Sequence, residues 1–136
     1  NRWNDSMSAV DHLSLNLPDF LSLAVKIAQS NPEPKWKLAS VAVKGGSVLS
    51  VGQNMFRQND TPPNTIHYTD LGIHAEENCL RGLAVVPKIL YVARVTKSGR
   101  VAMARPCPRC MKQIRAFGIK QICYTTNEGY AVERLT

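Results

Sequence analysis

The chain lacks the long apolar runs and the targeting signals of membrane and secreted proteins. No apolar stretch in its 136 residues approaches the ~20 residues that a membrane-spanning helix needs. Its start has no basic segment followed by an apolar one, as a secretory signal peptide would have. The composition, with 44% hydrophobic and 20% charged residues, is that of an ordinary globular protein. These features predict a cytoplasmic protein with no membrane partner.

Internal repeats, linkers and low-complexity segments are also absent. The length suits one domain with a hydrophobic core of its own. Residues 1–17 are polar and mixed, and we expect an N-terminal arm or a remnant of cloning there. Residues 18–136 are expected to form a single domain.

The whole chain has a net charge of +7, and a long part of it contains no acidic residue. Between Asn78 and Asn127 there is no Asp or Glu. Basic residues in the same stretch are Arg81, Lys88, Arg94, Lys97, Arg100, Arg105, Arg109, Lys112, Arg115 and Lys120. A segment charged with one sign favours a phosphate-bearing partner, either a nucleotide or a nucleic acid. A solvated surface without a ligand is the alternative.

Cysteine is scarce, and its placement favours a metal site. Four cysteines in a chain without a secretory signal indicate metal binding or reduced thiols before structural disulfides. A redox-active pair of Cys107 and Cys110 is a competing interpretation, but it leaves His74 and Glu76 without a role.

What the sequence does contain is two clusters of chemically active residues, His74-Ala75-Glu76 and Pro106-Cys107-Pro108-Arg109-Cys110. Histidine nitrogen and cysteine thiolate are ligands that zinc prefers, and three protein ligands leave a fourth tetrahedral position for water. A carboxylate beside that water can act as the base in a hydrolytic reaction. The pattern resembles the signature of zinc nucleobase deaminases.

Hydrophobic periodicity and turn residues predict the order of the elements. We expect helices over 18–30, 74–83 and 107–117, and strands over 38–43, 48–51, 88–95, 119–125 and 130–135. Helices packed on a central mixed sheet follow from this order. The long polar connection from Gln53 to Gly72 is expected to wall the pocket and to set substrate choice. Ligand contacts from this connection could come from Arg57, Asn64, His67 and Tyr68.

The predicted helix starts bring the active residues to helix N-termini. Both thiols of Cys107 and Cys110 would gain from the helix dipole, which lowers a thiol pKa. Glu76 would reach the pocket without binding the metal, and would move a proton from water to the ring nitrogen of a base.

A closed structural zinc site is the competing interpretation of this cluster. It needs a fourth ligand, for which the candidates are Cys79, Cys123, His12 and His67. Cys79 and Cys123 lie in apolar runs, where a free cysteine behaves as a small core residue.

From about Pro18 to Leu135 the sequence resembles the cytidine/deoxycytidylate deaminase superfamily. The segments His74-Ala75-Glu76-Glu77-Asn78 and Cys107–Tyr124 are similar to its deoxycytidylate-type branch. The resemblance implies an α/β fold of three layers, α-β-α, with a central five-stranded mixed sheet, and it implies a homo-oligomer. The implied site residues are the zinc ligands His74, Cys107 and Cys110, the catalytic Glu76, and the substrate contacts Asn54, Ala75 and Pro106.

Three functions are consistent with these residues. The first is hydrolytic deamination of a free cytosine nucleotide or nucleoside to its uracil counterpart. The second is editing of cytosine or adenine in single-stranded DNA or RNA, for which base-stacking surfaces could come from Trp36, Phe56, Tyr68 and Phe117. The third is a zinc-stabilised binding module, but a purely structural site has no need of Glu76.

Overall fold

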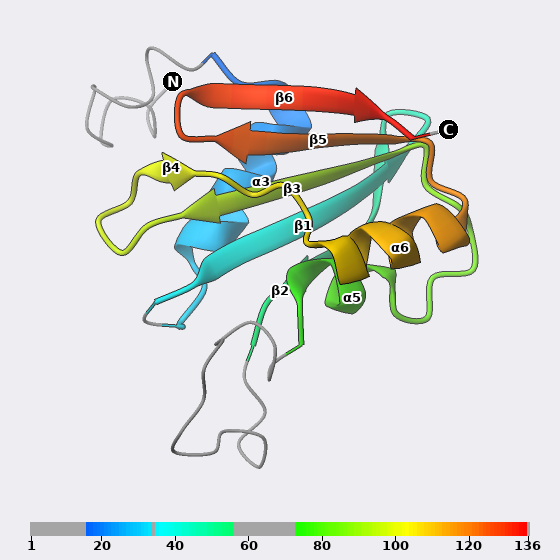
Figure 1. The fold of residues 1–136 in the computed structure, drawn as a ribbon, viewed down its shortest axis with the longest axis horizontal. Coiled ribbons are helices and arrows are strands. Elements are labelled where there is room, and N and C mark those ends of the chain that lie inside the picture. The colour runs from blue at the N-terminus through cyan, green and yellow to red at the C-terminus, as the bar shows by residue number, and fades with distance from the viewer. Residues whose placement is uncertain (1–15, 34, 56–72, 136) are drawn as a thin grey trace.

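The computed structural model describes residues 16–33, 35–55 and 73–135, which form one mixed sheet with helices on both faces (Figure 1). The strand order is β2-β1-β3-β5-β6, and β4 pairs with β3 off this path. The elements are α3 (Asp19–Gln29), β1 (Lys37–Lys44), β2 (Ser47–Gln53), α5 (Ala75–Leu80), β3 (Ile89–Val95), β4 (Val101–Ala102), α6 (Pro108–Phe117), β5 (Gln121–Thr126) and β6 (Gly129–Arg134).

The sheet combines hairpins with one parallel crossover. β1 runs antiparallel to β2 and β3, β5 runs antiparallel to β6, and β3 pairs with β5 in parallel. α6 lies between these two parallel strands in sequence, as a parallel crossover requires. The predicted Gly-Gly hairpin is confirmed: Gly45 and Gly46 have φ values of 61° and 76°, and this sign at both positions matches the twist of the flanking strands.

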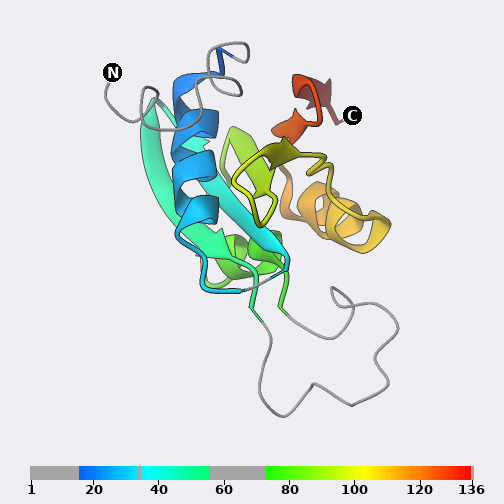
Figure 2. The same cartoon turned by 90° about the vertical axis from the view of Figure 1, so that its left-hand side faces the viewer.

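Helices cover the two faces of the sheet separately (Figure 2). α3 packs one face through Leu21, Ala24, Val25 and Ala28, against inward residues of β1 and β3. The core on the opposite face includes Cys79 of α5 and Ile114 of α6. The predicted three-layer α-β-α architecture is therefore confirmed.

Two details differ from the sequence-based expectation. The sheet gains the short strand β4, which pairs Val101 and Ala102 with β3; two residues are too few to show a periodic pattern. α5 ends at Leu80, three residues earlier than expected, because the chain turns through Gly82 at a φ of 74°. Ala84, expected on the buried face, is consequently exposed.

The predicted arm falls almost entirely outside the described residues, and the division at residue 17 stays a prediction. Leu17 itself packs against the α3 side of the core. In the part of the chain that the structure describes, each helix is too short or too polar to span a bilayer.

Gly52 sets how closely α5 approaches the sheet. A Cβ atom on this residue would lie 2.4 Å from the backbone nitrogen of Cys79 and 2.7 Å from the carbonyl oxygen of Ala75. Asn78 also donates from Nδ2 to the backbone oxygen of Gln53 at 2.8 Å. The helix that starts at Ala75 is thus seated directly on β2, and this position determines where His74 lies.

Candidate active site

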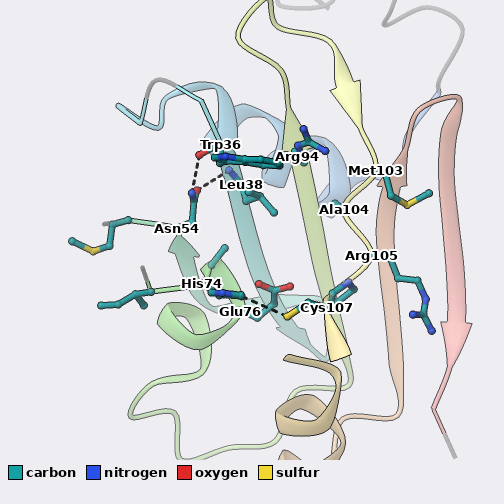
Figure 3. Close-up of a pocket in the computed structure, with 14 residues that line it drawn as sticks. Trp36, Leu38, Asn54, His74, Glu76, Arg94, Met103, Ala104, Arg105 and Cys107 are labelled. Atoms are coloured by element: carbon teal, nitrogen blue, oxygen red, sulfur yellow. Dashed lines mark hydrogen bonds between the residues drawn. The ribbon is translucent and has the colours of Figure 1, made fainter. Parts of the chain in front are cut away.

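Two helix N-termini bring the three predicted metal ligands together. His74 is the N-cap residue of α5, Cys107 is the N-cap residue of α6, and Cys110 lies in the first turn of α6. His74 Nδ1 lies 3.1 Å from Cys110 Sγ. It lies 3.8 Å from Cys107 Sγ, and Figure 3 draws this second contact. All three ligand atoms lie within 4.8 Å of one another.

These donor atoms fit zinc in kind and in spacing. Zinc bonds of about 2.1 Å to nitrogen and about 2.3 Å to sulfur, at a tetrahedral angle, place the nitrogen and sulfur about 3.6 Å apart. The two nitrogen–sulfur separations of 3.1 and 3.8 Å bracket this value. One imidazole and two thiolates are also a donor set that selects zinc over harder cations.

A fourth protein ligand is not found among residues 16–33, 35–55 and 73–135. Cys79 and Cys123 are buried in the two hydrophobic cores, and Cys79 also contacts Ser50 Oγ. His12 and His67 lie outside the described residues. All four cysteines are free thiols, so Cys107 and Cys110 do not form the disulfide of the redox interpretation.

Glu77 links the two helices that carry these ligands. Its Oε1 accepts a hydrogen bond from the His74 backbone N–H at 3.0 Å, which caps α5. Both of its carboxylate oxygens accept hydrogen bonds from Arg109 of α6, and Gln113 donates to Oε2 at 3.2 Å. Partial burial acts to raise the pKa of Glu77, but these hydrogen bonds and the charge of Arg109 outweigh it, so the pKa is lowered.

Glu76 faces the same pocket from the first turn of α5 (Figure 3). Its side chain is buried, with 4% of the residue exposed, and burial raises the pKa of its carboxyl. A buried carboxyl with a raised pKa exchanges protons more readily near neutral pH than an exposed one.

The expected lowering of the thiol pKa by the helix dipole is wrong for Cys110. Burial raises the pKa of its thiol, and the charge of Glu76 and the neighbouring Cys107 add to the rise. In the metal-free protein, loss of solvent and nearby negative charge therefore outweigh the helix dipole.

A cavity opens beside this cluster. Its lining residues are Trp36, Leu38, Asn54, Met55, Ile73, His74, Ala75, Glu76, Arg94, Met103, Ala104, Arg105, Pro106 and Cys107. The three predicted substrate contacts, Asn54, Ala75 and Pro106, are all among them.

Asn54 also has a structural role that the sequence did not reveal. Its Oδ1 accepts hydrogen bonds from the Leu38 backbone N–H at 2.9 Å and from Asn31 Nδ2 at 2.6 Å. Its Nδ2 donates to the backbone oxygen of Trp36 at 2.7 Å. Asn54 therefore ties the end of β2 to the start of β1 at the cavity wall.

Sequence reasoning missed Arg94 as a pocket residue. It counted Arg94 only as part of the basic segment and named Trp36 only as a stacking surface, yet the two lie together, with the guanidinium carbon 4.5 Å from the ring centroid. The available signal was one charged residue inside the otherwise apolar run of β3.

Of the other suggested stacking and loop residues, the structure describes only Phe117. Phe117 packs against the core. Phe56, Arg57, Asn64, His67 and Tyr68 lie outside the described residues, so the role of the 53–72 connection stays a prediction.

Comparison with known proteins agrees with this geometry. The family model described as "Cytidine and deoxycytidylate deaminase zinc-binding region" matches residues 16–126. A comparison with curated protein sequences finds no significant match.

Solved structures of two related kinds share the fold. The dCMP deaminase from the cyanophage S-TIM5, in complex with dCMP and dUMP, is 24% identical, with a TM-score of 0.56 over 79% of this chain and 79% of that chain. Its apo form is 23% identical, with a TM-score of 0.53 over 80% of this chain and 84% of that chain. The cytidine deaminase from Mycobacterium leprae is 20% identical, with a TM-score of 0.52 over 82% of this chain and 88% of that chain.

At these identities the solved structures show the fold, whereas the family model covers most of the sequence, including both ligand clusters. The His/Cys/Cys cluster found independently in the structure is compatible with the metal that this family binds. The chain therefore belongs to the zinc-binding cytidine and deoxycytidylate deaminase family.

Proposed function

We propose that this protein is a hydrolytic deaminase that converts the cytosine of a free nucleotide or nucleoside to uracil and releases ammonia. The observation that carries the proposal is the position of Glu76, a buried carboxylate that faces the cavity beside His74, Cys107 and Cys110. A purely structural zinc site gives no reason to bury a carboxylate there, because burial of an ionisable group is costly.

The proposed mechanism assigns separate roles to the metal ligands and to Glu76. His74, Cys107 and Cys110 would hold zinc, which when bound lowers the pKa of water and makes it a nucleophile. Glu76 takes a proton from the attacking water and delivers it to the ring nitrogen beside the amine-bearing carbon. As the carbon–nitrogen bond breaks, Glu76 passes the proton of the new carbon–oxygen group to the amine, which leaves as ammonia.

Substrate contacts are proposed for three cavity residues. Asn54 uses one amide hydrogen on the Trp36 backbone, and its second hydrogen is available for a sugar or base oxygen. The backbone of Ala75, at the start of α5, and Pro106 flank the metal ligands and would contact the pyrimidine ring. The complex of the cyanophage enzyme with dCMP and dUMP supports a cytosine nucleotide as the ligand class.

The alternative of nucleic-acid editing is supported by the basic segment from Asn78 to Asn127. Binding to a nucleic acid would weaken steeply with added salt, because it releases counterions from the phosphates. A homo-oligomer, implied by the resemblance, also stays a prediction, which size-exclusion chromatography with light scattering tests.

Ammonia release by zinc-loaded protein tests the proposal. The panel contains cytosine, cytidine, deoxycytidine, their monophosphates, adenosine, and short single-stranded DNA and RNA. We expect turnover of a free cytosine monomer and none by Glu76→Gln. Activity confined to oligonucleotides would replace the proposal with editing, and no activity on any substrate would favour a binding module.

A further inference from the structure

Arg94 occupies the end of the cavity away from the metal ligands. It projects from β3 opposite Leu38 of β1, its register partner, and its guanidinium stacks over the ring of Trp36 (Figure 3). Trp36, Leu38 and Arg94 all line the cavity that also contains Glu76. An aromatic ring beneath a guanidinium orients it and favours its positive charge.

This cation has no anionic partner among the described residues. Its Nε is buried and has no hydrogen-bond acceptor. Burial is the cause that lowers the pKa of Arg94, and no acid in the described part of the chain offsets it. Arg105, on the same cavity, and Arg109, beside it, are instead paired with Glu133 and Glu77.

A partly buried cation is costly in the free protein when no anionic partner lies beside it, as is the case for Arg94 among the described residues. Burial removes water from the guanidinium, and within residues 16–33, 35–55 and 73–135 no carboxylate compensates for that loss. A buried unsatisfied donor in a native structure calls for an explanation such as a ligand. Arg94 is among the residues that line the cavity, and an arginine at such a place is suited to a phosphate, which a guanidinium can bind through two parallel hydrogen bonds.

We infer that Arg94, stacked on Trp36, binds the phosphate of the substrate and makes the enzyme select a cytosine nucleotide over the nucleoside. The inference rests on the proposed function, because phosphate is the anionic group that distinguishes these two substrates. Glu76 and Arg94 then contact opposite ends of one ligand. Glu76 contacts the base near the metal ligands, and Arg94 contacts the phosphate near Trp36.

Calorimetric binding of the reaction products separates this inference from catalysis. dUMP and deoxyuridine are titrated into zinc-loaded wild type, Arg94→Gln, Arg94→Lys and Arg134→Gln. Arg134 is exposed on β6 and serves as the charge-matched control. We expect Arg94→Gln to weaken dUMP binding by about tenfold or more, the range for a charge-assisted hydrogen bond, and to leave deoxyuridine binding unchanged. Arg94→Lys should fall between, because lysine keeps the charge but not the fork.

Thermal unfolding gives a second readout. If Arg94 serves a ligand, Arg94→Gln should unfold at about the temperature of wild type or a higher one. The variant loses the stack on Trp36, but it also removes a partly buried charge that has no ion pair among the described residues. A lower unfolding temperature together with equal loss of dUMP and deoxyuridine binding would make Arg94 structural and overturn the inference.

Two further outcomes also test whether Arg94 binds the substrate phosphate. Equal affinity of wild type for dUMP and deoxyuridine would overturn the inference, as would Arg94-dependent binding of a cytosine-containing oligonucleotide but not of dUMP. If no substrate releases ammonia but dUMP binding still depends on Arg94, the phosphate site stands and the proposed reaction fails.

Discussion

Arg109 Nη2 lies 2.9 Å from each carboxylate oxygen of Glu77, and so joins the N-terminus of α6 to the N-terminus of α5. The same carboxylate accepts the backbone N–H of His74. One side chain therefore holds both helix ends that carry the proposed zinc ligands.

Glu77→Ala should loosen the metal site without removing a ligand. Partners that orient metal ligands contribute about 10–100-fold to metal affinity. We therefore expect Glu77→Ala to weaken zinc binding, measured by competition with a chelator, by a factor of about 10–100. Lys112→Gln, on the exposed side of α6, is the control. Equal zinc affinity in Glu77→Ala would show that the two helices hold their positions without this link.

Glu76→Gln separates proton transfer from metal binding. Because the amide cannot carry the proton, ammonia release should fall by about 100-fold or more. Zinc content, measured by atomic absorption, should stay at the wild-type level. Cys107→Ala should lose both zinc and activity, and a fully active Glu76→Gln protein would refute the proposed role of this carboxylate.

Gly52→Ala should destabilise the fold near the site. The added Cβ would meet backbone atoms of α5 at 2.4 and 2.7 Å, and backbone cannot move aside as a flexible side chain can. Overpacking of this kind costs about 1–3 kcal/mol in the free energy of unfolding. Urea denaturation measures the loss, with Ser47→Ala at the exposed start of β2 as control. An unchanged unfolding midpoint would mean that α5 is not held against β2 in solution.

Asn54→Ala should destabilise the protein even without substrate. The substitution removes the acceptor for Asn31 Nδ2 and for the Leu38 backbone N–H. Each buried donor left without a partner costs about 1–3 kcal/mol. Asn127→Ala is the control, since Asn127 is exposed and its side chain accepts one bond, from the Met103 backbone. Equal losses in the two variants, by urea unfolding, would contradict the structural role of Asn54.

The ion pair of Arg105 and Glu133 should make the stability of the fold depend on pH in the acidic range. Hydrogen bonds from Arg105 and then Tyr124 lower the pKa of Glu133 to about 2, from an ordinary value of 4.5. Because the folded-state pKa is the lower one, the pair stabilises the protein above about pH 4.5, and this contribution is lost as the pH falls toward 2.

Comparison of wild type with Glu133→Gln measures this contribution. The side chains of Arg105 and Glu133 are 47% and 29% exposed, so solvent screens the pair. We therefore expect a difference of about 1 kcal/mol or less in the free energy of unfolding, reduced further by salt. The difference should be constant from pH 5 to 7 and shrink below pH 4.5. A difference that grows on acidification would contradict the assignment.

Local patterns in the sequence determined most of the fold and the cluster of proposed ligands. The helix over 107–117 was predicted within one residue at its start, since Pro108 can begin a helix and Gly118, at a φ of 102°, can end one. The hairpin at Gly45 and Gly46 was also predicted, because glycine readily adopts the positive φ values that its turn requires. Both rest on conformational preferences of neighbouring residues, which a linear sequence records directly.

Tertiary structure alone decided the relations between distant segments. The Glu77–Arg109 bridge and the hydrogen bonds of Asn54 join residues from different elements, and β4 exists because β3 offers it a partner. Arg94 is the clearest case. The sequence showed a charge in an apolar strand, but only the fold placed this charge over Trp36 with no carboxylate of the described residues beside it. Burial and charge compensation depend on what packs around a residue in three dimensions, and no local pattern contains that information.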